Sequence, residues 1–346
     1  MDMKVTRLLQ LLFAFALLFN VSCSNDDEVM MPTTSYENGI LITNEGNFGT
    51  PNADVTFVTG NLSLKQDNIY SANNGSNLGD VLQTIAFSGD KAYLVLNNSN
   101  KVKVVNRYTF KSKGEITEQI NQPRYMAVAN NALYVTNDKY GGDKYVSIYN
   151  AANLSFIKKI TFTDSVERIV QAGGNIFVQN ASYGFGSKIT YINTSNNEIQ
   201  STITLPNGNI NKTISNNNNV YVITSGTADS YIYQISSTGS IVKTTTLTGI
   251  ANATNLEIDT NKFYFTSGNK VYSMDMTATA TPSAPLFTVT DNSFSTLYGF
   301  SVINGRIFTS DANGFTQDSK ITVYNTSGSV ISTFTAGKGA NGFYAN

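Results

Sequence analysis

The chain has 346 residues, of which 41% are hydrophobic and only 14% are charged, and its formal net charge is −1. The sequence contains no basic block, so we expect no nucleic-acid partner. It has no histidine and a single cysteine, which excludes Ser–His and Cys–His nucleophile schemes, imidazole metal sites and an intrachain disulfide. Any catalysis would therefore have to use Asp, Glu, Lys, Arg or Tyr side chains.

The first 22 residues are predicted to be a signal peptide. Lys4 and Arg7 precede an apolar run from Leu8 to Phe19. This run is too short to span a bilayer as a mature helix, and its basic flank is typical of a secretory signal. The sequence therefore predicts export of the chain from the cytoplasm.

The segment Asn20-Val21-Ser22-Cys23 resembles a bacterial lipobox, although Asn20 stands where a leucine is usual. We predict lipidation at Cys23, with an ordinary signal peptide and an incidental cysteine as the alternative. The acidic cluster Ser24-Asn25-Asp26-Asp27-Glu28 resembles the surface-export signal of Bacteroidota-type lipoproteins. Residues 23–37 are then a lipidated, flexible tether between the membrane and the folded domain.

One short strand motif recurs along the rest of the chain. Its last residues are separated by 53, 40, 43, 44, 43 and 43 positions. A period near 40–45 residues is typical of β-propeller blades with four strands each. The seven copies are Ile40–Asn44, Tyr93–Asn97, Leu133–Asn137, Ile176–Asn180, Val220–Thr224, Phe263–Ser267 and Arg306–Ser310.

The two ends of the repeat region complement each other. Residues 38–70 supply the second, third and fourth strands of a blade, and nothing before Asn38 resembles a first strand. The tail Gly342-Phe343-Tyr344-Ala345-Asn346 follows a unit that already has four strands. We therefore predict an all-β fold over 38–346, a single seven-bladed β-propeller of four-stranded blades closed by the C-terminal strand, which completes the first blade and removes the open edges.

Long loops follow four of the seven motif strands, and each carries aromatic side chains beside glycine and asparagine. In propellers these loops and the blade-to-blade connections gather on one face around the central channel, where ligands bind. We predict ligand contacts from the loop aromatics, from one strand-terminal asparagine and from two arginines in the connections: Phe48, Tyr140, Tyr183, Phe185, Phe315, Asn44, Arg124 and Arg168.

Each of these residues also has a structural alternative. The aromatics can fold back as local loop packing, and Asn44 can cap its strand through an Asx-type turn. The arginines can form a buried structural ion pair with Glu167. No Asp-x-Asp-x-Asp-Gly loop occurs, so we predict no metal site despite the acidic residues of these loops, Asp138, Asp143, Asp311 and Asp318.

Residues 133–137 reproduce the signature of the YVTN-type β-propeller repeat, and the similarity extends over 38–346. The segment Asn44–Gly49, followed by Asn52 and Asp54–Phe57, is similar to the first-blade motif of a family of surface lipoprotein propellers. Most members of that family carry a domain-of-unknown-function label, and one branch captures cobalamin at the cell surface for a TonB-dependent transporter. The resemblance implies an outer-membrane lipoprotein exposed on the cell surface, but it does not identify a ligand, because loops vary independently of the scaffold.

From these observations we expect a monomeric, non-catalytic binding module that needs no cofactor and contacts the membrane only through its lipid anchor. Its partner would be a small ligand or an outer-membrane protein such as a TonB-dependent transporter, in a nutrient-capture role. A propeller enzyme of the lyase or lactonase type, with Tyr or Lys as the base, is the alternative. Two carboxylates, or an arginine with a tyrosine, converging in the channel would favour that enzyme. A pure adhesion or scaffold role is a third possibility.

Overall fold

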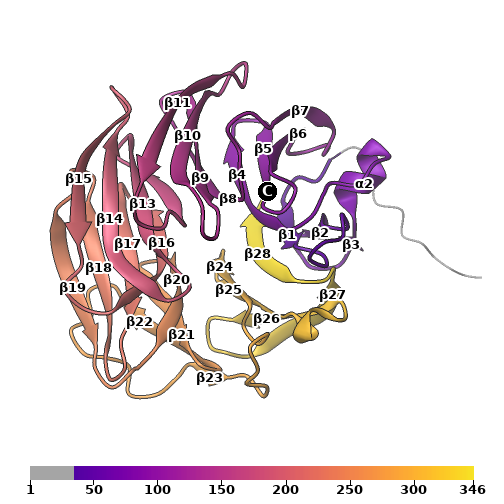
Figure 1. Cartoon of the computed structure of the whole chain (residues 1–346). Coiled ribbons are helices and arrows are strands. Elements are labelled where there is room, and N and C mark those ends of the chain that lie inside the picture. Colours follow the sequence, from indigo (N-terminus) through magenta and orange to yellow (C-terminus); the bar gives the residue numbers. More distant parts are fainter. Residues whose placement is uncertain (1–34) are drawn as a thin grey trace, which may run out of the picture. The chain divides into compact units, whose positions relative to one another are not determined.

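The computed structural model describes residues 35–346, which form seven four-stranded antiparallel sheets arranged as blades around a central axis (Figure 1). The prediction of a seven-bladed propeller is confirmed. The predicted signal peptide, Cys23 and most of the predicted tether lie outside the described residues. Within residues 35–346 no helix is long and apolar enough to cross a bilayer.

The first blade combines both ends of the described chain, and the other six each use four consecutive strands. The first blade contains β28 (Ala340–Ala345), β1 (Gly39–Asn44), β2 (Asp54–Thr59) and β3 (Lys65–Gln66). The next three blades contain β4 (Leu82–Ser88), β5 (Lys91–Leu96), β6 (Lys101–Asn106) and β7 (Ser112–Ile116); β8 (Pro123–Ala129), β9 (Ala132–Asp138), β10 (Lys144–Asn150) and β11 (Phe156–Phe162); and β12 (Ile169–Ala172), β13 (Asn175–Ser182), β14 (Phe185–Asn193) and β15 (Glu198–Thr204). The last three contain β16 (Asn209–Asn216), β17 (Asn219–Ser225), β18 (Ser230–Ser236) and β19 (Ile241–Leu247); β20 (Ala253–Asp259), β21 (Lys262–Ser267), β22 (Lys270–Asp275) and β23 (Phe287–Thr288); and β24 (Gly299–Ile303), β25 (Arg306–Asp311), β26 (Ser319–Asn325) and β27 (Val330–Ala336).

The recurring motif of the sequence forms the second strand of every blade. These strands are buried on both faces because each lies between two neighbouring blades, as the fully buried β1 and the nearly fully buried β9 illustrate. The core therefore consists of apolar layers between blades. In one such layer Tyr93 and Val95 pack with Leu133 and Val135 of the next blade. The outer strand β15, by contrast, is almost wholly exposed.

The ring closes through the C-terminal strand. β28 pairs antiparallel with β1, placing Phe343 opposite Ile42 and Ala345 opposite Ile40. Figure 1 shows this last segment of the chain lying beside the first strand. The Phe343 ring is buried and lies 5.5 Å from the ring of Phe308 in the adjacent blade. The predicted completion of the first blade by the tail is confirmed.

Two local features were not foreseen. The short helix α2 (Ile69–Asn74) follows β3, and the carboxylate of Asp54 accepts hydrogen bonds from the backbone N–H groups of Tyr70 and Ser71 in its first turn. Tyr36, which the sequence analysis places in the tether, packs its ring on Phe57 and Phe110 at centroid distances of 5.2 and 5.8 Å. The folded domain therefore includes residues just before position 38.

Candidate functional site

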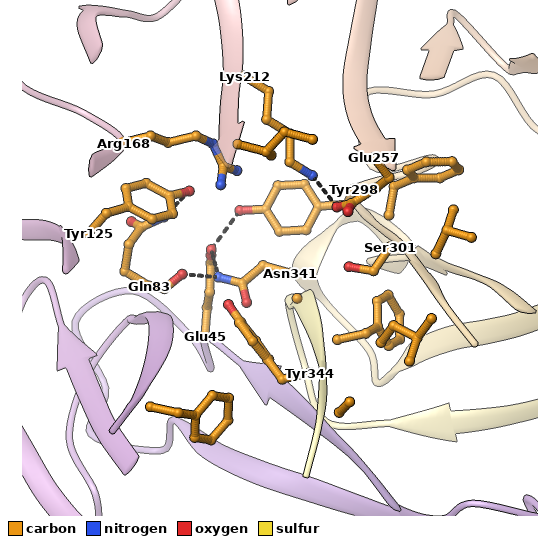
Figure 2. A pocket seen from close by; sticks show the side chains of 18 residues that line it. Glu45, Gln83, Tyr125, Arg168, Lys212, Glu257, Tyr298, Ser301, Asn341 and Tyr344 are labelled. Atoms are coloured by element: carbon orange, nitrogen blue, oxygen red, sulfur yellow. Dashed lines mark hydrogen bonds and ion pairs between the residues drawn. The ribbon is translucent and has the colours of Figure 1, made fainter. Parts of the chain in front are cut away.

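A pocket of about 540 Å³ lies in the central channel, within the size range of small-molecule sites. All seven blades contribute to it from their inner strands or the residues at the strand ends, so it coincides with the propeller axis (Figure 2). The side chains that define this channel pocket are Glu45, Gln83, Phe87, Tyr125, Arg168, Lys212, Ile214, Glu257, Tyr298, Phe300, Ser301, Val302, Ile303, Asn341, Phe343 and Tyr344.

Bulges at the beginning of the inner strands turn polar side chains into this pocket. The pairing register shifts between Leu82 and Thr84 on β4 and between Pro123 and Met126 on β8. Similar shifts occur on β16 and β20. A β-bulge leaves an extra residue unpaired and re-aims its side chain. Gln83 and Tyr125, which lie at these shifts, therefore face the channel instead of continuing the strand alternation.

Glu45 is the acidic centre of a small hydrogen-bonded group. Its Oε1 accepts a hydrogen bond of 2.8 Å from the hydroxyl of Tyr298 and one of 2.7 Å from Nδ2 of Asn341 (Figure 2). Burial raises the pKa of Glu45, although both hydrogen bonds oppose the change. Burial, together with the nearby Glu45 charge, also raises the pKa of Tyr298. The group is thus pre-positioned, and the Tyr298 phenol stays protonated at neutral pH.

Two ion pairs flank this group. Arg124 binds Glu167 in a bidentate arrangement, with Nε to Oε2 at 2.9 Å and Nη2 to Oε1 at 2.7 Å. On the other side of the channel Nζ of Lys212 lies 2.7 Å from Oε1 of Glu257. Burial lowers the pKa of Lys212, Glu257 opposes this shift, and the positive charge of Arg168 adds to it. Each of these two cations is therefore neutralised by its own glutamate.

Arg168 differs from both of these cations. Its guanidinium carbon lies 4.4 Å from the centroid of the Tyr125 ring, a cation–π arrangement. Within residues 35–346 it forms no salt bridge of 4.0 Å or less. Figure 2 shows the guanidinium between Tyr125 and Lys212, pointing toward the centre of the pocket. Among the described residues that line the pocket, Arg168 is thus a cation without a salt-bridge partner.

The structure places the predicted site residues in three different settings. Arg168 lines the pocket, and Arg124 forms the structural ion pair with Glu167 that was considered as its alternative. Asn44 is buried, and its Nδ2 donates a hydrogen bond of 3.1 Å to Thr56 Oγ1. The pocket, the ion pair and the strand end thus account for one predicted residue each, three of the eight.

The five predicted loop aromatics do not line the pocket. Phe48, Tyr140, Tyr183 and Phe185 are 77–88% exposed. Phe315 is partly buried and packs edge-on against Tyr298, with ring centroids 4.8 Å apart. It therefore supports the tyrosine that binds Glu45, whereas the four exposed rings remain a predicted contact surface.

Sequence reasoning did not select several pocket residues as site residues: Tyr125, which it had noted only as part of a blade connection, and Lys212, Glu257, Tyr298, Asn341 and Glu45. One signal was available, because charged residues are scarce and yet Lys212 and Glu257 occur within inner strands. The pocket residues as a set converge only when the ring closes, since Glu45 and Tyr298, for example, are 253 positions apart. The spacing of the repeats could not show which of these side chains face the axis.

The pocket meets the condition set above for an enzyme, because Arg168 lies with Tyr125 and two carboxylates, Glu45 and Glu257, line the same space. Each candidate base is nevertheless engaged. Glu45 accepts two hydrogen bonds, and Glu257 is paired with Lys212. Burial raises the pKa of Tyr125 and so disfavours its phenolate. The arrangement therefore holds these polar groups in fixed positions around the pocket.

A second pocket of about 540 Å³ lies between two blades. Its aromatic rings, Tyr221 and Phe263, are buried against each other with centroids 5.7 Å apart. The two rings are thus largely engaged in the core, and the ammonium group of Lys243 is bound to the backbone oxygen of Met276. We therefore consider the channel pocket the better candidate. Within the described part of the chain no group of three or more His, Cys, Asp or Glu could hold a metal ion.

Comparison with known proteins identifies a family and a fold. A family model described as "Domain of unknown function (DUF5074)" matches residues 38–340. No curated protein matches the chain. The fold is similar to a quinonprotein alcohol dehydrogenase-like protein from Bacteroides thetaiotaomicron VPI-5482, with a TM-score of 0.68 and 15% identity over 88% of this chain and 77% of that one.

Two further solved structures share the fold. The Kuenenia stuttgartiensis hydrazine synthase gives a TM-score of 0.60 at 16% identity, over 75% of this chain and 87% of that one. The dihydro-heme d1 dehydrogenase NirN gives 0.57 at 12% identity, over 90% and 76%. At such identities the likeness extends to the propeller architecture alone.

Proposed function

The chain belongs to the DUF5074 family, whose description specifies no activity, and from the geometry of its channel we propose that it is a non-catalytic module that captures a small ligand in the channel pocket. The proposal includes an outer-membrane location through lipidation of Cys23, and delivery of the ligand to an outer-membrane protein such as a TonB-dependent transporter. The predicted signal peptide and lipobox support the location, and the resemblance to nutrient-capturing surface lipoproteins supports the partner.

One observation carries the ligand-binding part of this proposal. Polar groups with fixed orientation, Glu45, Tyr298 and Asn341, converge with Arg168 in a single axial pocket of about 540 Å³. Ligand sites combine such a concave space with a few oriented polar groups. The exposed loop aromatics, by contrast, do not line this pocket.

The proposal is tested by calorimetry with the unlipidated protein, residues 30–346, and a panel of cobalamins, haem and oligosaccharides. Gln83→Trp places a bulky ring in the pocket, and it sacrifices little native bonding because the Gln83 amide makes only a 3.5 Å contact with the Tyr125 hydroxyl. The double variant Tyr183→Ala/Phe185→Ala removes two exposed rings and serves as the matched control. We expect Gln83→Trp to abolish saturable binding and the double variant to retain it. The reverse pattern would show that the ligand binds at the loop aromatics and not in the channel pocket.

A lyase remains the second candidate, favoured by the presence of Arg168 beside Tyr125 in the pocket. Arginine would neutralise the carboxylate of a uronic acid, and a tyrosine or lysine would remove the proton on C5. The C4–O bond then breaks, a C4=C5 double bond forms, and the 4-linked sugar leaves as an alcohol that takes the proton from the protonated base. The test is the ultraviolet absorbance of unsaturated products after incubation with acidic oligosaccharides. Product formation that disappears in Tyr125→Phe would support the enzyme and contradict the purely binding role.

A further inference from the structure

The free guanidinium of Arg168 indicates what kind of chemical group the pocket receives. The guanidinium carbon lies over the Tyr125 ring, whereas neither Glu45 nor Glu257 forms a salt bridge with the guanidinium. A guanidinium presents five N–H donors in a planar fork that matches a carboxylate in a bidentate manner. Its polar edge is thus available to an oxyanion inside a partly enclosed space.

The charges around Arg168 favour a single negative charge. Lys212 and Glu257 form an ion pair with each other, and Glu45 is held by hydrogen bonds from Tyr298 and Asn341. Arg168 is therefore the cation of the pocket that has no salt-bridge partner within residues 35–346. A carboxylate matches that charge, whereas a phosphate dianion would bring a second negative charge close to Glu257 and Glu45.

The same pocket has an apolar part that can hold the rest of such a ligand. Polar lining residues precede apolar ones on three inner strands: Gln83 precedes Phe87, Lys212 precedes Ile214, and Ser301 precedes Ile303. The inner strands of all blades begin at the same face of the propeller and run in the same direction along its axis. Gln83 and Phe87 are separated by roughly 13 Å along the strand. The channel is therefore polar where the inner strands begin and more apolar further along them.

We propose that the channel pocket binds a small amphipathic monocarboxylic acid, with its carboxylate on the free edge of Arg168 and its apolar body against Phe87, Ile214 and Ile303. This inference rests on the proposed ligand-capture function and adds the chemical class of the ligand. Arg168 supplies the specificity for the charge, and the guanidinium is held over the Tyr125 ring by a cation–π contact.

The test compares two acids with their neutral amides. Benzoate, hexanoate, benzamide, hexanamide and inorganic phosphate are titrated into residues 30–346 and followed by ligand-observed nuclear magnetic resonance. Each acid should bind at least about tenfold more tightly than its amide, because a hydrogen-bonded charge contributes roughly that factor. Arg168→Gln should weaken binding of the acids about tenfold or more without changing binding of the amides. Lys113→Gln, which removes an exposed positive charge on the outer strand β7, should change neither.

Several results would overturn the inference: equal affinities for acid and amide, acid binding unchanged in Arg168→Gln, or no saturable binding of either acid. Tighter binding of phosphate than of the acids would also overturn it, and would indicate that the pocket binds a phosphate group instead of a carboxylate. If a compound of the cobalamin, haem and oligosaccharide panel still binds and Gln83→Trp abolishes that binding, the capture function stands and only the acid class fails. Thermal unfolding of Arg168→Gln checks that the variant is folded.

Discussion

Because β28 closes the propeller, we predict that truncation of the buried Phe343 side chain in this strand lowers the free energy of unfolding substantially. Phe343 is 4% exposed and packs on Phe308 within a cluster that also contains Ile42 and Val58. Phe343→Ala removes that packing and leaves a cavity between the first and last blades, where the surroundings are held by two sheets. Such substitutions in a packed core cost about 3–5 kcal/mol of the free energy of unfolding.

The assay is equilibrium unfolding in urea, followed by tyrosine fluorescence, of the wild type, Phe343→Ala and Phe48→Ala. Phe48 is the matched control, because its ring is 81% exposed and its removal should alter stability by no more than about 0.5 kcal/mol. Deletion of residues 340–346 should cost more than Phe343→Ala, since it also removes the β28–β1 ladder and exposes an edge. If Phe343→Ala unfolds at the same urea concentration as Phe48→Ala, the closure reasoning is refuted.

Three further changes test the electrostatics and the capping seen in the structure. Glu257→Gln leaves the charge of Lys212 buried without a carboxylate and should cost about 3–5 kcal/mol in urea unfolding, whereas Glu198→Gln, at an exposed ion pair, should cost less than about 1 kcal/mol; equal costs would contradict the buried pair. Because burial raises the pKa of Glu45, its contribution to stability is complete below the unfolded pKa and is lost as pH rises through the folded pKa. The stability of the wild type relative to Glu45→Gln should therefore be greater near about pH 4 than near about pH 7, and a difference that is independent of pH would disprove the shift. Asp54→Ala deprives the first turn of α2 of its acceptor and should cost about 1–3 kcal/mol, measured by thermal unfolding; an unchanged melting temperature would show that the cap is dispensable.

The architecture could be predicted because it is repeated. Each blade buries its second strand on both faces, so seven nearly apolar strands recur at a fixed interval, and the tail was left over as a strand without a blade. The repeat pattern did not predict the packing of Tyr36 or the helix α2. Tyr36 has no counterpart in other repeats, and α2 depends on the carboxylate of Asp54, which lies on a neighbouring strand.

The candidate site could be predicted only in part, because its residues do not repeat. Arg168 was found through the scarcity of charges in the blade connections. Asn341 and Glu45, by contrast, are 296 positions apart and meet only after the ring has closed. Tyr125 reaches the channel through a register shift in β8 that no sequence period records. Aromatic residues in long loops gave a stronger sequence signal than these buried polar groups, although most of those rings lie outside the pocket.

The claim that the channel pocket is the ligand site is tested most directly by locating a bound compound. Protein labelled at isoleucine methyl groups would be titrated with the compounds of the panel and with benzoate. Binding in the channel should shift the signals of Ile214 and Ile303, which line the pocket, and leave those of Ile157 and Ile199 on exposed strands unchanged. Saturable binding with unshifted Ile214 and Ile303 signals, or no binding by any of these compounds, would contradict the account.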